Sequence, residues 1–97
     1  MNLKIVVTNG INNLIKEDYI YSTDLDFILL KFISNDWGDL CNEDKKFQNE
    51  LLKNPNSKYE YRFMGVYLIN NIKVWIISEY NYSIKSLIMT ILLPEEY

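Results

Sequence analysis

The first half of the chain combines one short apolar run with the residue spacing of amphipathic helices. The β-branched run Leu3–Val7 predicts a strand, and the turn signal Asn9-Gly10 follows it. Apolar residues after this turn recur at i, i+3 and i+4, which predicts a short helix that begins after Thr8 or Asn9.

A longer helix is predicted from Ser22 onward. Ser22 offers a hydroxyl group suited to an N-cap, and Asp24 and Asp26 follow in the first turn, where negative charge complements the helix dipole. The apolar residues that repeat along it are Leu25, Ile28, Leu29, Phe32 and Ile33. A stripe this wide is typical of a helix that packs on the centre of a core.

Turn-forming residues from Ser34 to Leu40 end this helix, and Gly38 among them suits a left-handed backbone position. A third helix is predicted near Asn42, because Asn is a good N-cap and Glu43 and Asp44 occupy its first turn. We expect its apolar seam to comprise Phe47 and Leu51, with Leu52 able to extend it.

The second half of the chain favours strands. A loop with several turn residues, Asn54–Ser57, leads into two β-rich runs, Lys58–Ile69 and Ile72–Tyr80. The dipeptide Asn70-Asn71 joins them, and Asn tolerates the positive φ of a two-residue hairpin turn. A last strand is predicted over Ser86–Leu93.

A two-residue turn sets the register of this hairpin. It places Arg62 opposite Glu79 and Tyr61 opposite Tyr80. Cross-strand pairs of this kind contribute ~0.2 to 1 kcal/mol each, and a slip of one residue would lose both.

Together these elements predict one α+β domain that spans residues 1–97. Its parts are a short N-terminal strand and two to three helices packed on a three-stranded antiparallel β-meander. A chain of 97 residues with 48% hydrophobic and 24% charged residues has room for one core and is typical of a folded domain.

The residue inventory excludes several kinds of chemistry. Cys41 is the single cysteine and His is absent, so an intramolecular disulfide, a structural zinc site and Ser-His or Cys-His nucleophile pairs are excluded within one chain. We therefore expect no catalytic activity, no metal and no cofactor. The N-terminal apolar run is too short for a secretory signal, and no apolar stretch is membrane-spanning, which predicts a cytoplasmic protein.

Charge is divided unevenly along the chain. Residues 17–50 carry nine acidic and three basic residues, whereas the rest of the chain is net positive. An overall charge of −3, a pI near 4.8 and a single Arg disfavour direct binding to nucleic acid.

The most distinctive segment is Asn35–Leu40, in which a Trp stands between two acids on the bend between two helices. An aromatic anchor among carboxylates is typical of a protein interface. We predict that the partner-binding residues are Asp36, Trp37, Asp39, Glu43 and Asp44. In the alternative interpretation, Trp37 folds back over the core while Asp36 and Asp39 cap turns.

Two further patterns in the sequence can be compared with known kinds of binding site. The acids of residues 36–44 do not have the spacing of an EF-hand loop, so they do not indicate calcium. An alternating stripe, Tyr59, Tyr61, Phe63 and Tyr67, could stack bases or contact a partner. It could equally be the sheet face that packs on the helices.

Four short motifs along the chain are Asn35–Leu40, Glu43-Asp44-Lys45, Val74–Glu79 and Leu92–Tyr97. Together they resemble a family of small proteins encoded on plasmids, integrative elements and phages. Their order and spacing cover most of the chain from Leu25 onward. Members of that family often have a His where Phe32 stands here, which favours recognition over catalysis for this chain.

The resemblance implies a mobile-element accessory protein. The leading hypothesis is an inhibitor of a host defence effector, of the anti-CRISPR or antirestriction type, whose partner is a host protein such as a nuclease. One alternative is a module that binds a nucleotide or another small ligand by stacking it on Trp and Tyr. Another is a regulatory or structural subunit that forms a homodimer, since the unpaired edge of a short sheet invites strand addition.

Overall fold

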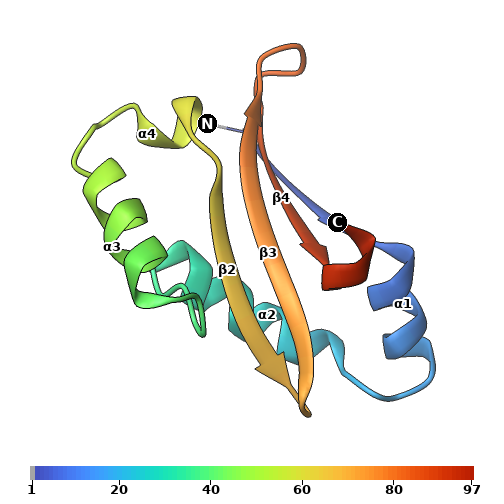
Figure 1. Ribbon diagram of the computed structural model, residues 1–97. Coiled ribbons are helices and arrows are strands. Elements are labelled where there is room, and N and C mark those ends of the chain that lie inside the picture. The colour runs from blue at the N-terminus through green and yellow to red at the C-terminus, as the bar shows by residue number, and fades with distance from the viewer. Residues whose placement is uncertain (1) are drawn as a thin grey trace.

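The computed structural model of the chain describes residues 2–97 and has a four-stranded sheet at its centre (Figure 1). In chain order the elements are β1 (Asn2–Val7), α1 (Asn9–Lys16), α2 (Ser22–Ile33), α3 (Asn42–Leu51), α4 (Ser57–Glu60), β2 (Phe63–Ile69), β3 (Ile72–Asn81), β4 (Ser86–Leu92) and the 3₁₀ helix η1 (Pro94–Glu96). The fold class is α+β, as predicted. Among the described residues, no helix has the length and apolar character needed to cross a membrane.

The sheet is mixed, with strand order β1-β4-β3-β2. The antiparallel meander β2-β3-β4 is present, but β1 adds to it in parallel beside β4, with Asn2 opposite Ser86 and Val7 opposite Ile91. The predicted sheet of three antiparallel strands was therefore one strand short. A parallel pair requires a long crossover connection, and here the helices and two strands between β1 and β4 provide it.

The predicted hairpin register is confirmed. Ile69 pairs with Ile72 and Phe63 pairs with Ser78, while Asn70 and Asn71 adopt φ values of 51° and 64°. Both Asn residues thus occupy the left-handed region that the two-residue turn requires. Next to the paired residues, Arg62 Nε lies 3.4 Å from the Glu79 carboxylate.

The prediction that β2 begins at Lys58 was wrong, because residues 57–60 form the helical turn α4. The Asn54 side chain accepts a hydrogen bond from the Asn56 N–H, and the Ser57 N–H donates to the Asn54 carbonyl, so the chain turns again before it extends. Tyr80 consequently packs edge-on against Tyr59, at 4.8 Å between ring centroids, and the predicted pairing of Tyr80 with Tyr61 is absent.

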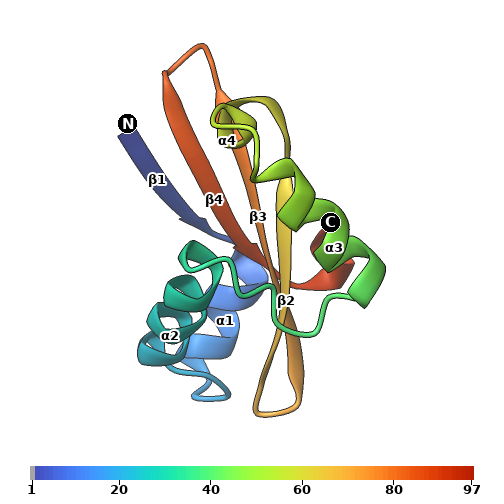
Figure 2. The ribbon, with the colours of Figure 1, turned by 90° about the vertical axis from the view of Figure 1, so that its left-hand side faces the viewer.

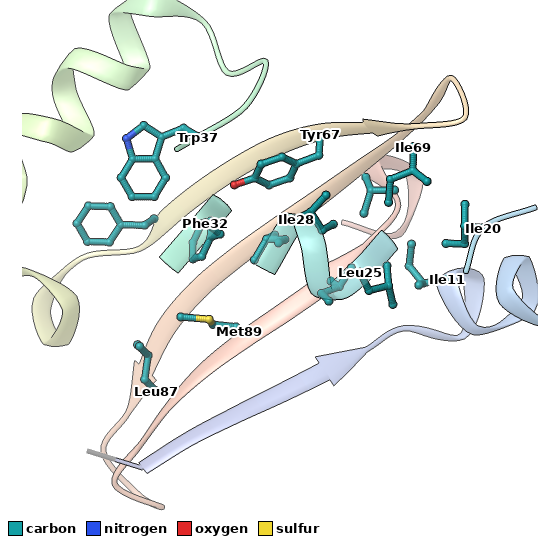
Figure 3. Close-up of a cluster of buried hydrophobic side chains, with 14 residues drawn as sticks. Ile11, Ile20, Leu25, Ile28, Phe32, Trp37, Tyr67, Ile69, Leu87 and Met89 are labelled. Atoms are coloured by element: carbon teal, nitrogen blue, oxygen red, sulfur yellow. The ribbon is translucent and has the colours of Figure 1, made fainter. Parts of the chain in front are cut away.

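The core lies between α2 and one face of the sheet (Figure 3). The buried residues of α2 are Leu25, Ile28 and Phe32. Helix α2 begins at Ser22 as predicted, although the capping group is the Asp24 carboxylate, which accepts a hydrogen bond from the Tyr21 N–H at 2.9 Å. Of the aromatic stripe, Phe63 and Tyr67 share this sheet face and are both buried, which supports the packing interpretation.

The C-terminal turn η1 is tied to the start of α1 by Glu96. The two oxygens of its carboxylate accept hydrogen bonds from the Thr8 hydroxyl at 2.6 Å, the Gly10 N–H at 3.0 Å and the Leu93 N–H at 2.9 Å. Glu96 thus satisfies a free N–H group at the N-terminus of α1, a role that an N-cap side chain usually has. The bond from Thr8 is the largest of the effects that hold the pKa of Glu96 below its ordinary value.

We expect Glu96→Gln to lower the free energy of unfolding at neutral pH by about 0.5–2 kcal/mol, since an amide cannot accept all three bonds. The folded-state pKa of Glu96 is depressed, so its contribution is present above the ordinary Glu pKa and is lost as pH falls through the folded-state value. Urea unfolding as a function of pH checks this. Equal stability of wild type and Glu96→Gln at neutral pH would contradict the role of the carboxylate.

Candidate functional site

Trp37 lies in the core and not on the surface. Its indole stacks on Phe63, at 5.6 Å between ring centroids and 15° between planes, and meets Phe32 edge-on at 5.4 Å (Figure 3). The indole N–H donates a hydrogen bond to the Asn49 side-chain oxygen at 3.0 Å, and only 4% of Trp37 is exposed. The prediction of Trp37 as an exposed partner anchor is therefore wrong, and the alternative interpretation, in which it folds back over the core, holds for Trp37.

The backbone around Trp37 explains this burial. The loop between α2 and α3 runs along the outer edge of β2 (Figure 2), where the Val66 N–H donates to the Trp37 carbonyl at 3.0 Å and the Asp39 N–H donates to the Val66 carbonyl at 2.7 Å. These two bonds make the loop a short parallel partner of β2. They also fix the point at which the Trp37 side chain enters the core.

Gly38 permits this close approach. Its φ is +67°, and a Cβ atom at this position would lie 2.0 Å from the Val66 carbonyl oxygen. Any other residue would therefore be strained by its backbone and would push the loop away from β2. The close packing of the loop on β2 therefore explains why residue 38, between Trp37 and Asp39, is a glycine.

Asp36 also has a structural role. Its carboxylate accepts a hydrogen bond from the Gly38 N–H at 3.0 Å, and its carbonyl accepts one from the Tyr67 hydroxyl at 2.7 Å. Burial, with a smaller effect from the negative charge of Asp36, raises the pKa of Tyr67 well above its ordinary value. The Tyr67 hydroxyl therefore remains a donor to the loop throughout the physiological pH range.

Helix α3 is joined to the same edge by Gln48. The Met64 N–H donates to the Gln48 side-chain oxygen at 2.8 Å, and the Gln48 amide nitrogen donates to the Met64 carbonyl at 3.0 Å. The Gln48 amide thus satisfies both the N–H and the C=O of Met64, as the backbone of a neighbouring strand would. Together with the 37–39 loop it covers Met64 and Val66, two of the three outward-facing positions of β2.

The predicted apolar seam of α3 is confirmed for Leu51 and Leu52, which pack against the core, and wrong for Phe47. Gln48 is 7% exposed, whereas Phe47, predicted as the apolar seam, is 65% exposed. The hydrogen bonds to Met64 and the bond between Trp37 and Asn49 determine which side of the helix faces the sheet. A buried primary amide is not visible in an apolar pattern, so the sequence offered no direct signal for this orientation.

The four predicted acids, Asp36, Asp39, Glu43 and Asp44, are all exposed. Two of them lie on α3 beside Phe47, because Glu43 precedes it by four residues and Asp44 by three, and Glu50 follows it by three. Residues at these spacings are neighbours on a helix surface. We call Glu43, Asp44, Phe47 and Glu50 the α3 outer face.

The α3 outer face has few interactions within the chain. The Cys41 thiol donates to the Asp44 carboxylate at 3.1 Å, and the exposed ion pair between Glu50 and Lys53 measures 3.0 Å. Across residues 2–97, no three His, Cys, Asp or Glu side chains are grouped so that they could hold a metal ion. Asp44 and Glu50 thus each have one partner within the chain, while the carboxylates of Glu43, Asp44 and Glu50 all remain exposed to solvent.

A groove of about 350 Å³ lies between α2 and β2. Its walls include Asp24, Phe27 and Lys31 from α2, Asp39 from the loop, and Leu68 from β2. Trp37 does not line it, and the Tyr67 hydroxyl at its wall is already bonded to Asp36. The predicted ligand site, in which Trp and Tyr stack on a base, is therefore not formed by Trp37.

Comparisons with protein-family models, with curated proteins and with solved structures find no match to this chain. Its surface and its contacts are therefore the basis for an inference about function.

We expect Trp37→Ala to lower the free energy of unfolding by about 3–5 kcal/mol, because it removes a buried ring and its hydrogen bond. Trp37→Phe should cost less, since the ring contacts with Phe63 remain. Asp39→Lys is the matched control from the same loop, and its exposed side chain should leave stability within about 0.5 kcal/mol. Chemical unfolding curves measure all three, and an unchanged midpoint for Trp37→Ala would contradict the burial of Trp37.

Proposed function

We propose that this protein acts by binding another protein, and that the α3 outer face is the contact surface. The observation that carries the proposal is the exposure of Phe47, at 65%, beside three carboxylates. Aromatic residues are enriched in the centres of interfaces, where they supply most of the binding free energy. Within the chain Phe47 lies outside the core cluster, so its ring is available to a partner.

The charge around Phe47 indicates a basic partner. Residues 17–50 hold nine of the 13 acids of the chain, and on α3 the acids Glu43, Asp44 and Glu50 near Phe47 outnumber the bases Lys45 and Lys46. A negative patch increases the association rate with a positively charged surface and disfavours acidic partners. We infer a partner with an apolar pocket for Phe47 and Lys or Arg residues around that pocket.

The finer form of the proposal is that the protein is a mobile-element accessory protein that inhibits a host defence effector, of the anti-CRISPR or antirestriction type. The motifs that resemble small proteins of mobile elements support the accessory role, and the complementarity between an acidic helix and the basic channel of a nuclease supports the inhibitory one. A net charge of −3 is small for a mimic of DNA over the whole surface, which favours a discrete patch.

A second candidate function is the binding of a small ligand in the groove between α2 and β2. Its volume of about 350 Å³ lies at the lower end of the range for ligand pockets, and Lys31 and Asp24 offer charges of both signs. Phe27 in this groove is 62% exposed. It therefore serves as a control for Phe47, because the two proposals depend on different aromatic residues.

We expect Phe47→Ala to weaken partner binding by thirtyfold or more, which corresponds to about 2 kcal/mol, without a change in stability. The double variant Glu43→Lys with Asp44→Lys should abolish binding, and binding by wild type should weaken with added salt. Tagged protein is used to capture partners from a bacterial lysate, and affinity for the captured protein is then measured by calorimetry.

Phe27→Ala and Glu17→Lys are the matched controls, one aromatic and one acidic, and both should bind as wild type does. Loss of binding in Phe27→Ala with retention in Phe47→Ala would move the site to the groove. If wild type enriches no protein over the Glu43→Lys, Asp44→Lys variant, the proposal of a protein partner at α3 fails.

A further inference from the structure

The outer edge of β1 is unpaired among residues 2–97. In its parallel pairing with β4, Val7 lies opposite Ile91 and the Thr8 N–H donates to the Ile91 carbonyl at 3.1 Å. Alternate residues of β1 therefore bond to β4, and Leu3, Ile5 and Val7 direct their N–H and C=O groups away from the sheet. Figure 2 shows β1 as the outermost strand, with no element beyond it.

The exposed edge is apolar as well as unpaired. Leu3 and Ile5 are each 48% exposed and Val6 is 43% exposed. An apolar edge strand is a template for pairing with another chain, and proteins usually protect such an edge with charges, prolines or a covering segment. Within residues 2–97, the 37–39 loop and Gln48 cover the β2 edge, whereas no segment covers the β1 edge.

The apolar surface continues onto α2. Asp24, Phe27 and Lys31 line the groove on the β2 side of this helix. At 3.6 residues per turn, Ile33 lies on the opposite flank, toward β1, and Leu30 lies between that flank and solvent. Leu30 is 65% exposed and Ile33 is 46% exposed.

We propose that a second copy of this chain pairs with the outer edge of β1, strand to strand and antiparallel, about a two-fold axis that passes between the two Ile5 residues. The axis stands perpendicular to the sheet, so one continuous sheet runs through both copies with all helices retained on their original face. The flanks of the two α2 helices then face each other across the axis.

Hydrogen bonding and charge select this register. Antiparallel partners must both direct their backbone groups outward, and centring on Ile5 pairs Leu3 with the partner's Val7 and Ile5 with the partner's Ile5. Lys4 then lies opposite the partner's Val6. Centring on Lys4 or on Val6 would leave fewer bonded pairs among these residues, and centring on Lys4 would also place the two Lys4 charges opposite each other, which is unfavourable.

The oligomeric state of charge variants tests both the dimer and its register. Wild type should sediment with twice the 11.6 kDa mass of the chain. Val6→Lys places two lysine pairs across the interface and should raise the dissociation constant by about tenfold or more, whereas Val6→Glu pairs with Lys4 and should dimerise at least as well as wild type. Leu68→Lys, an exposed control on β2, should have no effect.

Hydrogen exchange of individual amides gives a second measurement. In the dimer the Ile5 N–H is bonded and should exchange slowly, and dilution to monomer should accelerate it. Ile5→Pro removes this donor without removing a bond to β4, and it should yield a folded monomer by circular dichroism. If Ile5→Pro does not fold, the comparison of Val6→Lys with Val6→Glu still tests the dimer and its register.

A wild-type chain that remains monomeric up to millimolar concentration would overturn the proposal. So would a dimer whose affinity is the same in Val6→Lys and Val6→Glu, because that result would contradict the pairing of residue 6 with the partner's Lys4. A monomer that instead captures another protein through β1, and loses it in Ile5→Pro, would show that a different extended segment occupies this edge.

Discussion

The fold depends on the attachment of the 37–39 loop to β2. Two backbone hydrogen bonds to Val66 hold the loop, and they can form at this distance because residue 38 is a glycine with positive φ. The same attachment directs Trp37 between Phe32 and Phe63, and the Asn49 that receives its indole N–H lies on α3. One short segment therefore joins α2, α3 and the sheet into a single core.

This arrangement divides a stretch that reads as one motif into residues that hold the fold and residues that are exposed. The Trp, the Gly and the first Asp of the 36–39 segment serve the fold, whereas the side chains of Asp39, Glu43 and Asp44 face solvent. The exposed aromatic residue of α3 is Phe47, one helical turn beyond Glu43. An interface that uses this acidic helix leaves the open β1 edge available, so a dimer could present two such helices at once.

The features that could be predicted from the sequence are those that depend on neighbours in the chain. The hairpin followed from Asn70-Asn71 and from the alternation beside it, and α2 followed from its apolar stripe and the acids of its first turn. The parallel pairing of β1 with β4 could not be read in this way, since it joins residues at opposite ends of the chain. The burial of Gln48 in place of Phe47 was also inaccessible, because it depends on the bonds that Gln48 makes with the Met64 backbone and not on hydrophobicity.

Native-state hydrogen exchange at Val66 and Asp39 tests the central claim most directly, because these two N–H groups form the bonds between the loop and β2. If the loop is part of the core, both amides should exchange only through global unfolding, with the same free energy of opening as amides in the centre of β3. Exchange of Val66 and Asp39 at the rate of an exposed loop, while β3 remains protected, would contradict the account.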